Sequence, residues 1–333
     1  MLNILLDITR AQGYSLGCRA PLPMPKSALY NFTAYGALLL TCALWGSNGT
    51  VARPLELVMG PFTLSVLRWL VVVLLLLPLV WPERAAMLRA MRTQGRLLVS
   101  FALLSGALQS GLVYAGLAGT TAIHLGLLNS AIPVMIIFIT WVWHGRQPRR
   151  LETIGLAVSL CGVLLILAHG DLAALLHLDF GAGDLMILAG MVNWSLYTIK
   201  LKDRPASLSL FAFAFLVALI GSVLASPVVA VEFVLRGLPQ MGAREMLSVL
   251  YIGVLPTLAG MLLFGYGVDR VGPVRAGIFA HFMPVFATLF AVLILGEVFH
   301  AYHAAGFVLV AGGAIMSCFR PDAVVTSPPP ARV

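Results

Sequence analysis

The chain has 333 residues, of which 60% are hydrophobic and only 10% are charged, with a formal net charge of +8. A soluble domain usually carries about a quarter charged residues, so a soluble protein of this composition would expose much of its apolar surface to water. The composition excludes that class and predicts an integral membrane protein.

Ten segments are apolar and long enough to be membrane-spanning helices, each of which needs roughly 20 apolar residues. In the first half of the chain they are Phe32–Val51, Phe62–Trp81, Leu97–Leu117, Thr121–Trp143 and Leu151–Ala168. In the second half they are Leu185–Ile199, Leu208–Val229, Leu247–Val268, Ala276–Leu295 and His303–Phe319. The sequence therefore predicts an all-α integral membrane fold with ten transmembrane helices.

The second half repeats glycine and proline positions of the first half at an offset of 151 residues. The matching pairs are Gly126 and Gly277, Pro133 and Pro284, Gly145 and Gly296, Gly155 and Gly306, and Gly162 and Gly313. Backbone geometry rather than apolarity decides where these two residue types occur, so the matches indicate a duplicated unit. We expect units at 29–168 and 184–319, an external linker at 169–183, and disordered cytoplasmic tails at 1–28 and 320–333.

The basic residues lie mainly in alternate connections between the predicted helices. With the N-terminus inside the cell, 17 of the 21 Lys and Arg residues fall on the cytoplasmic side and three on the opposite side. This bias is the positive-inside rule, and it predicts that both termini are cytoplasmic. Because each half has five spans, the second half enters the membrane from the opposite side, which makes the repeat inverted. The charges occupy six short separate segments, so we expect no nucleic-acid partner.

Several short motifs in this order resemble the EamA family of the drug/metabolite transporter superfamily. The first span contains Ala43-Leu44-Trp45-Gly46-Ser47-Asn48, the second contains Leu67-Arg68-Trp69, and the ninth contains Met283-Pro284-Val285-Phe286 before Leu295-Gly296-Glu297. The resemblance runs from about Phe32 to Phe319. It implies a transporter of two inverted five-helix repeats that exports small metabolites such as amino acids. The first repeat departs from the pattern, since Arg146 stands where the family often has Glu.

Polar and aromatic side chains within the predicted spans are the candidate substrate-binding residues, because polar groups in a bilayer usually face the protein interior or a water-filled cavity. These candidates are Trp45, Asn48, Gln109, Tyr114, Asn129, Asn193, Trp194, Tyr197 and His281. The alternative is that they form interhelical hydrogen bonds that only hold the bundle together.

Four other features carry two interpretations each. Pro133 and Pro284 are candidate gating hinges, or else static kinks. Arg68 attracts a substrate carboxylate or phosphate, or else has a structural role, which we favour. His281 takes part in proton coupling, or else is a neutral hydrogen-bonded histidine, which we favour. The small residues around Gly155 and Gly306 form a supporting contact or a dimer face, so a monomer and a homodimer are both open.

The predicted function is a secondary transporter that exports small polar metabolites, with amino acids as the best candidates, across the inner (plasma) membrane by alternating access. Its partners are a small-molecule substrate and the lipid bilayer. Another small metabolite class, such as a drug-like compound, a nucleoside or a sugar derivative, is the alternative, in either direction, and a membrane scaffold or sensor is a remote one. No cofactor or metal is expected, because the sequence has no Walker loop, HExxH motif, GxSxG motif or CxxC pair. We therefore expect no enzymatic activity.

Overall fold

The computed structural model describes residues 28–55, 58–120, 122–145, 147–171, 173, 181–295 and 298–318. The expected tails, Arg146 and Glu297 lie outside these residues. Within them every regular element is a helix and no strand occurs. The all-helical fold agrees with the sequence prediction.

The first half begins with the longest helix of the structure. Its elements are α2 (Ala28–Leu55), α3 (Pro61–Val80), the 3-10 turn η1 (Trp81–Glu83), α4 (Arg84–Ser105), α5 (Ala107–Leu117), α6 (Ala122–Ser130), α7 (Ile132–His144) and α8 (Arg150–Leu167). The second half contains α9 (Ala182–Lys200), the 3-10 turn η3 (Leu201–Asp203), α10 (Leu210–Arg236), α11 (Ala243–Ile252), the π-helix η4 (Gly253–Ala259) and α12 (Gly260–Val271). It ends with α13 (Pro273–Ile278), the 3-10 turn η5 (Phe279–His281), α14 (Phe282–Leu295) and α15 (Ala301–Cys318).

Several of these helices are long and apolar enough to cross a membrane. The described part contains five such stretches, Pro61–Leu117, Arg150–Leu167, Leu210–Arg236, Ala243–Val271 and Pro273–Phe290, and two shorter apolar helices, Leu127–Trp143 and Ala301–Ser317. Each of the ten predicted segments overlaps a helix. These lengths and compositions fit a helical membrane protein, and the count of ten crossings stays a prediction.

Four of the predicted segments are interrupted rather than continuous α-helices. α4 and α5 are separated by Gly106, whose backbone is extended, and α6 meets α7 at Ala131, two residues before Pro133. Between α11 and α12 the chain forms the π-helix η4, which contains Pro256, and η5 precedes Pro284 at the start of α14. The sequence predicted hinges only at the two prolines of the repeat.

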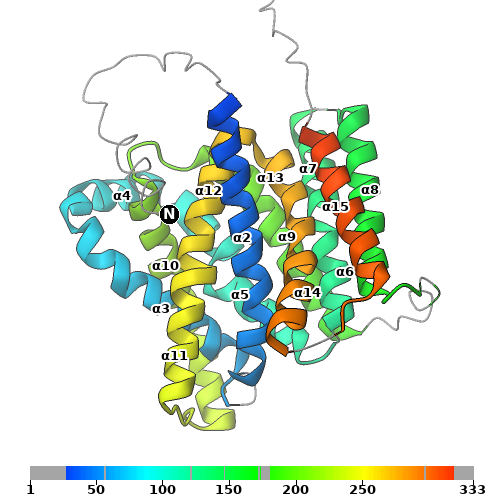
Figure 1. The fold of residues 1–333 in the computed structure, drawn as a ribbon. Coiled ribbons are helices and arrows are strands. Elements are labelled where there is room, and N and C mark those ends of the chain that lie inside the picture. The colour runs from blue at the N-terminus through cyan, green and yellow to red at the C-terminus, as the bar shows by residue number, and fades with distance from the viewer. Residues whose placement is uncertain are drawn as a thin grey trace, which may run out of the picture.

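The long helix α2 lies between α12 and α14 near the middle of the bundle, as Figure 1 shows. Small residues permit this close packing. A Cβ built at Gly46 would lie 3.0 Å from the carbonyl oxygen of Met283 in α14, and one built at Gly267 in α12 would lie 2.5 Å from Leu38. Any larger residue at these positions would push α2 away from its neighbours.

At one edge of the bundle α8 and α15 pack side by side along their whole length (Figure 1). Their backbones touch through two glycine pairs. A Cβ built at Gly155 would lie 2.5 Å from the carbonyl oxygen of Gly313, and one built at Gly162 would lie 2.7 Å from that of Gly306. The glycine rows that we considered as a dimer face are therefore used inside one chain, which leaves their supporting role.

The helices α3 and α10 also pack together, and each receives a carboxylate from near the end of the other. Glu232 accepts hydrogen bonds from the backbone N–H groups of Phe62 at 3.0 Å and Thr63 at 2.8 Å in the first turn of α3. Glu83, just after α3, accepts one from the hydroxyl of Ser209, the N-cap of α10, at 2.7 Å. An anion is favourable at a helix N-terminus because unpaired N–H groups and the positive end of the helix dipole meet there.

The contact between α8 and α15 makes a stability prediction with a neighbouring control. We expect Gly313→Ala to destabilise the protein by about 1–3 kcal/mol, because its methyl group would collide with the backbone of Gly155 and lie 2.5 Å from the backbone nitrogen of Ser159. Gly312→Ala is the control, since a Cβ at Gly312 meets no atom within 4 Å. Thermal unfolding of the two purified variants in detergent measures the difference. Equal melting temperatures would contradict the packing described here.

Candidate functional site

Two of the predicted aromatic residues meet in the interior of the bundle. The rings of Trp45 on α2 and Trp194 on α9 are 5.2 Å apart and nearly perpendicular, and Phe264 on α12 lies 5.2 Å from the first and 5.5 Å from the second. Edge-to-face contacts of this kind are favourable for aromatic pairs. Both tryptophans are half-buried, so part of each ring stays accessible. The three rings form an apolar wall contributed by both halves of the chain.

Tyr197, one turn after Trp194, is placed differently. Its ring centre is 5.0 Å from that of Trp194, but the side chain is only 1% exposed and packs edge-on against Phe101 at 6.0 Å. In this conformation Tyr197 supports Trp194 from the core.

A polar network lies one turn along α2 from Trp45. The Asn48 amide donates to the hydroxyl of Tyr114 on α5 at 3.3 Å, and the guanidinium of Arg68 on α3 donates to the same hydroxyl at 2.7 Å. A second guanidinium nitrogen donates to the hydroxyl of Ser110 at 2.7 Å. Gln109, beside Ser110, donates to the backbone carbonyl of Gly190 on α9 at 3.2 Å. Three predicted residues, Asn48, Gln109 and Tyr114, thus lie around an arginine.

Arg68 is the residue for which sequence reasoning favoured a purely structural role. Its guanidinium lies over the rings of Trp69 and Tyr114, at 6.0 and 5.3 Å from their centres. Its Nε is buried and has no hydrogen-bond partner in the described part of the chain. The available signal was a lone arginine within an apolar helix, but the sequence could not indicate which polar groups surround it.

His281 lies in the protein interior with no exposed surface. Its Nε2 is 3.0 Å from the backbone carbonyl of Ser130 at the end of α6, and its Nδ1 is 2.6 Å from the hydroxyl of Ser159 on α8. Nε2–H therefore donates to the carbonyl, and a neutral ring accepts the Ser159 hydroxyl proton at Nδ1. These contacts join α6, α8 and η5, and they make His281 part of the wall between the two halves.

The remaining predicted residues stay outside these networks. Asn129 and Asn193 are half-buried, and neither side chain forms a hydrogen bond with another described residue. Pro133 is the second residue of α7 and Pro284 the third of α14, so each lies directly after an interruption. Asn129, Pro133 and Pro284 thus lie on interrupted segments, whereas Asn193 lies on the continuous helix α9.

Side chains satisfy backbone carbonyls at each of the four interruptions. In each pair the first residue donates from its side chain and the second accepts at its backbone carbonyl. The pairs and their distances are Ser65 and Ala107 (2.7 Å), His281 and Ser130 (3.0 Å), Trp45 and Pro256 (2.9 Å), and Cys42 and Phe279 (3.0 Å). Irregular backbone at membrane depth is tolerated where protein groups replace the missing helical hydrogen bonds. Trp45 therefore both lines the aromatic wall and fastens α2 to the π-helix.

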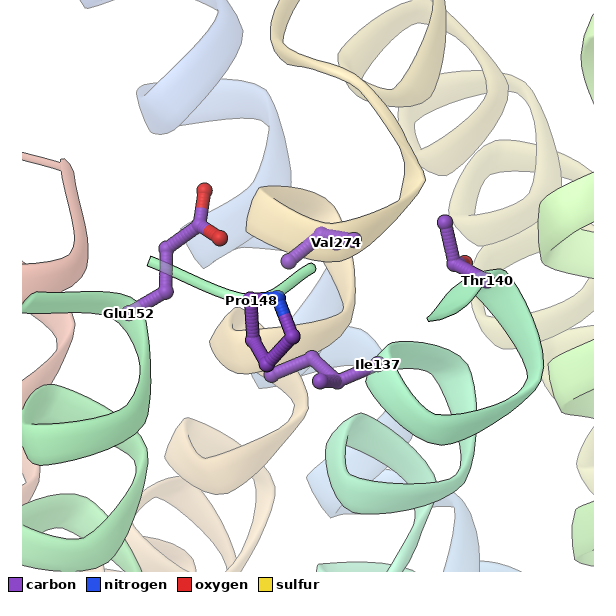
Figure 2. Close-up of a pocket in the computed structure, with 5 residues that line it drawn as sticks. All are labelled: Ile137, Thr140, Pro148, Glu152 and Val274. Carbon is purple, nitrogen blue, oxygen red and sulfur yellow. The ribbon is translucent and has the colours of Figure 1, made fainter. Parts of the chain in front are cut away.

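Figure 2 shows a separate small and partly open pocket between α7, α8 and α13. Its lining residues are Ile137, Thr140, Pro148, Glu152 and Val274. The Thr140 hydroxyl is buried without a hydrogen-bond partner among the described residues, while Glu152 accepts from the backbone of Arg149 at the start of α8. None of these residues belongs to the predicted set, and no sequence pattern singled the pocket out.

The chain resembles known proteins in sequence and in fold. A family model described as the EamA-like transporter family matches residues 32–168 and again residues 181–319. The uncharacterized transporter YetK of Bacillus subtilis is 26% identical over 87% of this chain and 89% of its own length. A probable amino-acid metabolite efflux pump of Salmonella typhimurium is 24% identical over 54% of this chain and 61% of its own. A solved crystal structure with 17% sequence identity has a similar fold, with a TM-score of 0.67 over 88% of this chain and 97% of that one.

The hydrogen bond between Trp45 and the π-helix can be tested by removing a single N–H group. We expect Trp45→Phe to lower the free energy of unfolding by about 1 kcal/mol more than Trp194→Phe does. Both substitutions shorten an indole in the same aromatic group, but only Trp45 donates to a backbone carbonyl, that of Pro256. Unfolding of the two variants in detergent, followed by tryptophan fluorescence, gives the comparison. A larger loss from Trp194→Phe would show that the Trp45 hydrogen bond contributes little.

Proposed function

The chain belongs to the EamA-like transporter family, and from this premise we propose that it is a secondary transporter that exports small polar metabolites, with amino acids as cargo, across the inner (plasma) membrane. The observation that carries the proposal is the polar network of Asn48, Arg68 and Tyr114 beside the aromatic wall, among interrupted helices. Transporter binding sites are typically formed by discontinuous helices near the middle of the membrane. The name of the Salmonella relative supports amino acids as the cargo class.

We propose further that the two halves are inverted repeats that move against each other. The family model matches each half separately. Contacts between the halves support the symmetry: the contact of Gly155 with Gly313 becomes that of Gly306 with Gly162 when the offset of 151 is applied. His281 contacts Ser130, which is the residue that corresponds to His281 in the first half when the offset of 151 is applied. Residues that contact their counterparts are expected on a two-fold axis, and such an axis allows alternating access.

The aromatic wall favours a second candidate cargo. The three rings of the wall, of which the Trp45 and Trp194 side chains are only half-buried, fit a molecule that carries a flat ring, such as a nucleoside or an aromatic drug-like compound. The polar network suits the hydrogen-bonding part of either cargo.

Transport itself is tested with the purified full chain in liposomes. We expect counterflow of at least one radiolabelled L-amino acid into liposomes preloaded with the unlabelled form, above the rate of protein-free liposomes. A panel of nucleosides and sugars run in parallel tests the alternative cargo. Flux of a nucleoside without flux of any amino acid would overturn the amino-acid proposal, and absence of flux for every compound would overturn transport of these classes.

The proposed binding site makes a mutational prediction. We expect Asn48→Ala and Trp194→Ala each to reduce the flux about tenfold or more, because each removes a group that contacts the cargo, while the amount of folded protein changes little. Gly49→Ala is the matched control, since Gly49 follows Asn48 on α2 and a Cβ there meets no atom within 4 Å. Normal flux in both alanine variants would exclude these residues from the site.

The proposed orientation predicts the result of reporter fusions. A reporter that is active only in the cytoplasm should be active when fused in the connection between Arg84 and Arg96, and inactive when fused between His169 and Gly183. The physical reason is the charge distribution, because short basic connections are retained on the cytoplasmic side. The reverse pattern would contradict the proposed topology.

A further inference from the structure

The guanidinium of Arg68 has hydrogen-bond donors that no described residue uses. It presents five N–H donors in a fixed plane. Two hydrogen bonds to described residues are found, to Tyr114 and to Ser110, both at 2.7 Å. Its Nε is buried without a partner in the described part of the chain. More than half of the donor capacity of the group is therefore unused.

Among the described residues, no carboxylate is found in a salt bridge with Arg68. The one salt bridge found within the described residues, between Arg204 and Asp269, does not involve it. The carboxylate that reaches α3 belongs to Glu232, and both of its oxygens accept hydrogen bonds from the first turn, at Phe62 and Thr63. Both hydrogen-bond partners of the guanidinium are neutral hydroxyl groups. A charge held away from water without a counter-ion raises the free energy of the protein, and an incoming anion lowers it.

The surroundings of Arg68 indicate where the rest of a ligand would lie. Tyr114 links the guanidinium to Asn48, and Trp45 lies one turn from Asn48 on α2. Arg68, Asn48 and Trp45 are all half-buried, so each keeps some accessible surface. A carboxylate placed on the guanidinium can also accept from the Asn48 amide, while the remainder of the molecule extends toward Trp45 and Trp194.

From this arrangement we infer that Arg68 recognises a carboxylate on the transported molecule and so selects cargo that carries a carboxylate. This inference rests on the proposed transport function and names the substrate class of that site. A purely structural role accounts for the two hydroxyl contacts but not for Nε, which has no hydrogen-bond partner in the described part of the chain. Planar guanidinium and carboxylate groups match in geometry and form two parallel hydrogen bonds, which a lysine cannot reproduce.

The test compares acids with their uncharged analogues. L-phenylalanine, L-threonine and L-glutamate, each paired with its α-carboxamide, and succinate are titrated against purified full-length protein, and binding is followed by ligand-induced thermal stabilisation. We expect the wild type to bind at least one acid about tenfold or more tightly than its carboxamide, as a charge-assisted hydrogen bond provides. Arg68→Gln should remove this preference while carboxamide binding stays within about threefold, and Arg68→Lys should lose most of it.

A second pair of variants tests the same point without removing the arginine. Ser110→Asp places a carboxylate against the guanidinium nitrogen that now contacts the Ser110 hydroxyl at 2.7 Å, so it should compete with the ligand and weaken acid binding about tenfold or more. Ser110→Asn has nearly the same size without the charge and should weaken acid binding much less. This pair keeps the inference falsifiable when Arg68→Gln does not fold.

The outcomes separate the two proposals. Equal discrimination between acid and carboxamide in Arg68→Gln and in the wild type overturns the role of Arg68, as does equal binding of acids and carboxamides by the wild type. Equal loss from Ser110→Asp and Ser110→Asn overturns it as well. Binding of succinate without binding or flux of any amino acid upholds the role of Arg68 and overturns the amino-acid cargo. Amino-acid flux that is unchanged in Arg68→Gln upholds the amino-acid cargo and overturns the role of Arg68.

Discussion

A helix within a bilayer can be interrupted only where other groups take over the hydrogen bonds that its backbone gives up. In the described residues a side chain donates to a backbone carbonyl at each of the four interruptions, and three of these donors lie in the other half of the chain: Trp45 reaches Pro256, Cys42 reaches Phe279, and His281 reaches Ser130. Three of the four interruptions are therefore also places where the two halves of the chain are joined. Two of these donors, Trp45 and Cys42, lie on α2, so the position of α2 depends on these two hydrogen bonds.

Two pairs of packed helices, α8 with α15 and α3 with α10, form what we call the frame of the structure, and the interrupted helices are more easily deformed. α8 and α15 are continuous and touch backbone to backbone, and α3 and α10 are closed at their N-termini by Glu232 and Glu83. The interrupted helices α5 and α12 contribute Tyr114 and Phe264 to the candidate site, whereas Trp45, Asn48, Arg68 and Trp194 lie on the continuous helices α2, α3 and α9. A helix that already lacks part of its internal hydrogen bonding can change shape by exchanging a few side-chain contacts, and π-helical turns occur frequently at functional sites. Movement of the halves is thus expected near Tyr114 and Phe264.

The sequence predicted the parts of this arrangement that depend on backbone chemistry. Proline marked two interruptions, because it lacks an N–H group, and spaced glycines marked the helices that pack closely. The π-helix contains Pro256 and the other break lies at Gly106, but neither residue belongs to the pairs repeated at an offset of 151, so the repeat did not mark them. The carbonyl donors Ser65 and Cys42 look like any small residue in an apolar helix. Asn48, Asn129 and Asn193 were equivalent candidates by hydropathy, but only Asn48 joins a network, because that depends on packing between distant segments. The glycine rows left a supporting contact and a dimer face open, because sequence cannot tell an internal partner from an external one, and the structure shows the internal contact.

The proposed selection of cargo by Arg68 depends on how charge is distributed in the interior. Glu83 and Glu232 lie near helix ends, where their charges act on the N-termini of α10 and α3. Such carboxylates stabilise the frame and are not free to neutralise an interior cation. Arg68 consequently gives the interior a positive potential, which the neutral hydroxyls of Tyr114 and Ser110 orient but do not cancel. In a region of low dielectric constant this potential acts on a ligand at a greater distance than van der Waals contacts do, because Coulomb energy falls slowly with distance. A bound cation would be opposed by the arginine, whereas a carboxylate supplies the missing counter-ion and completes the hydrogen bonding of the site.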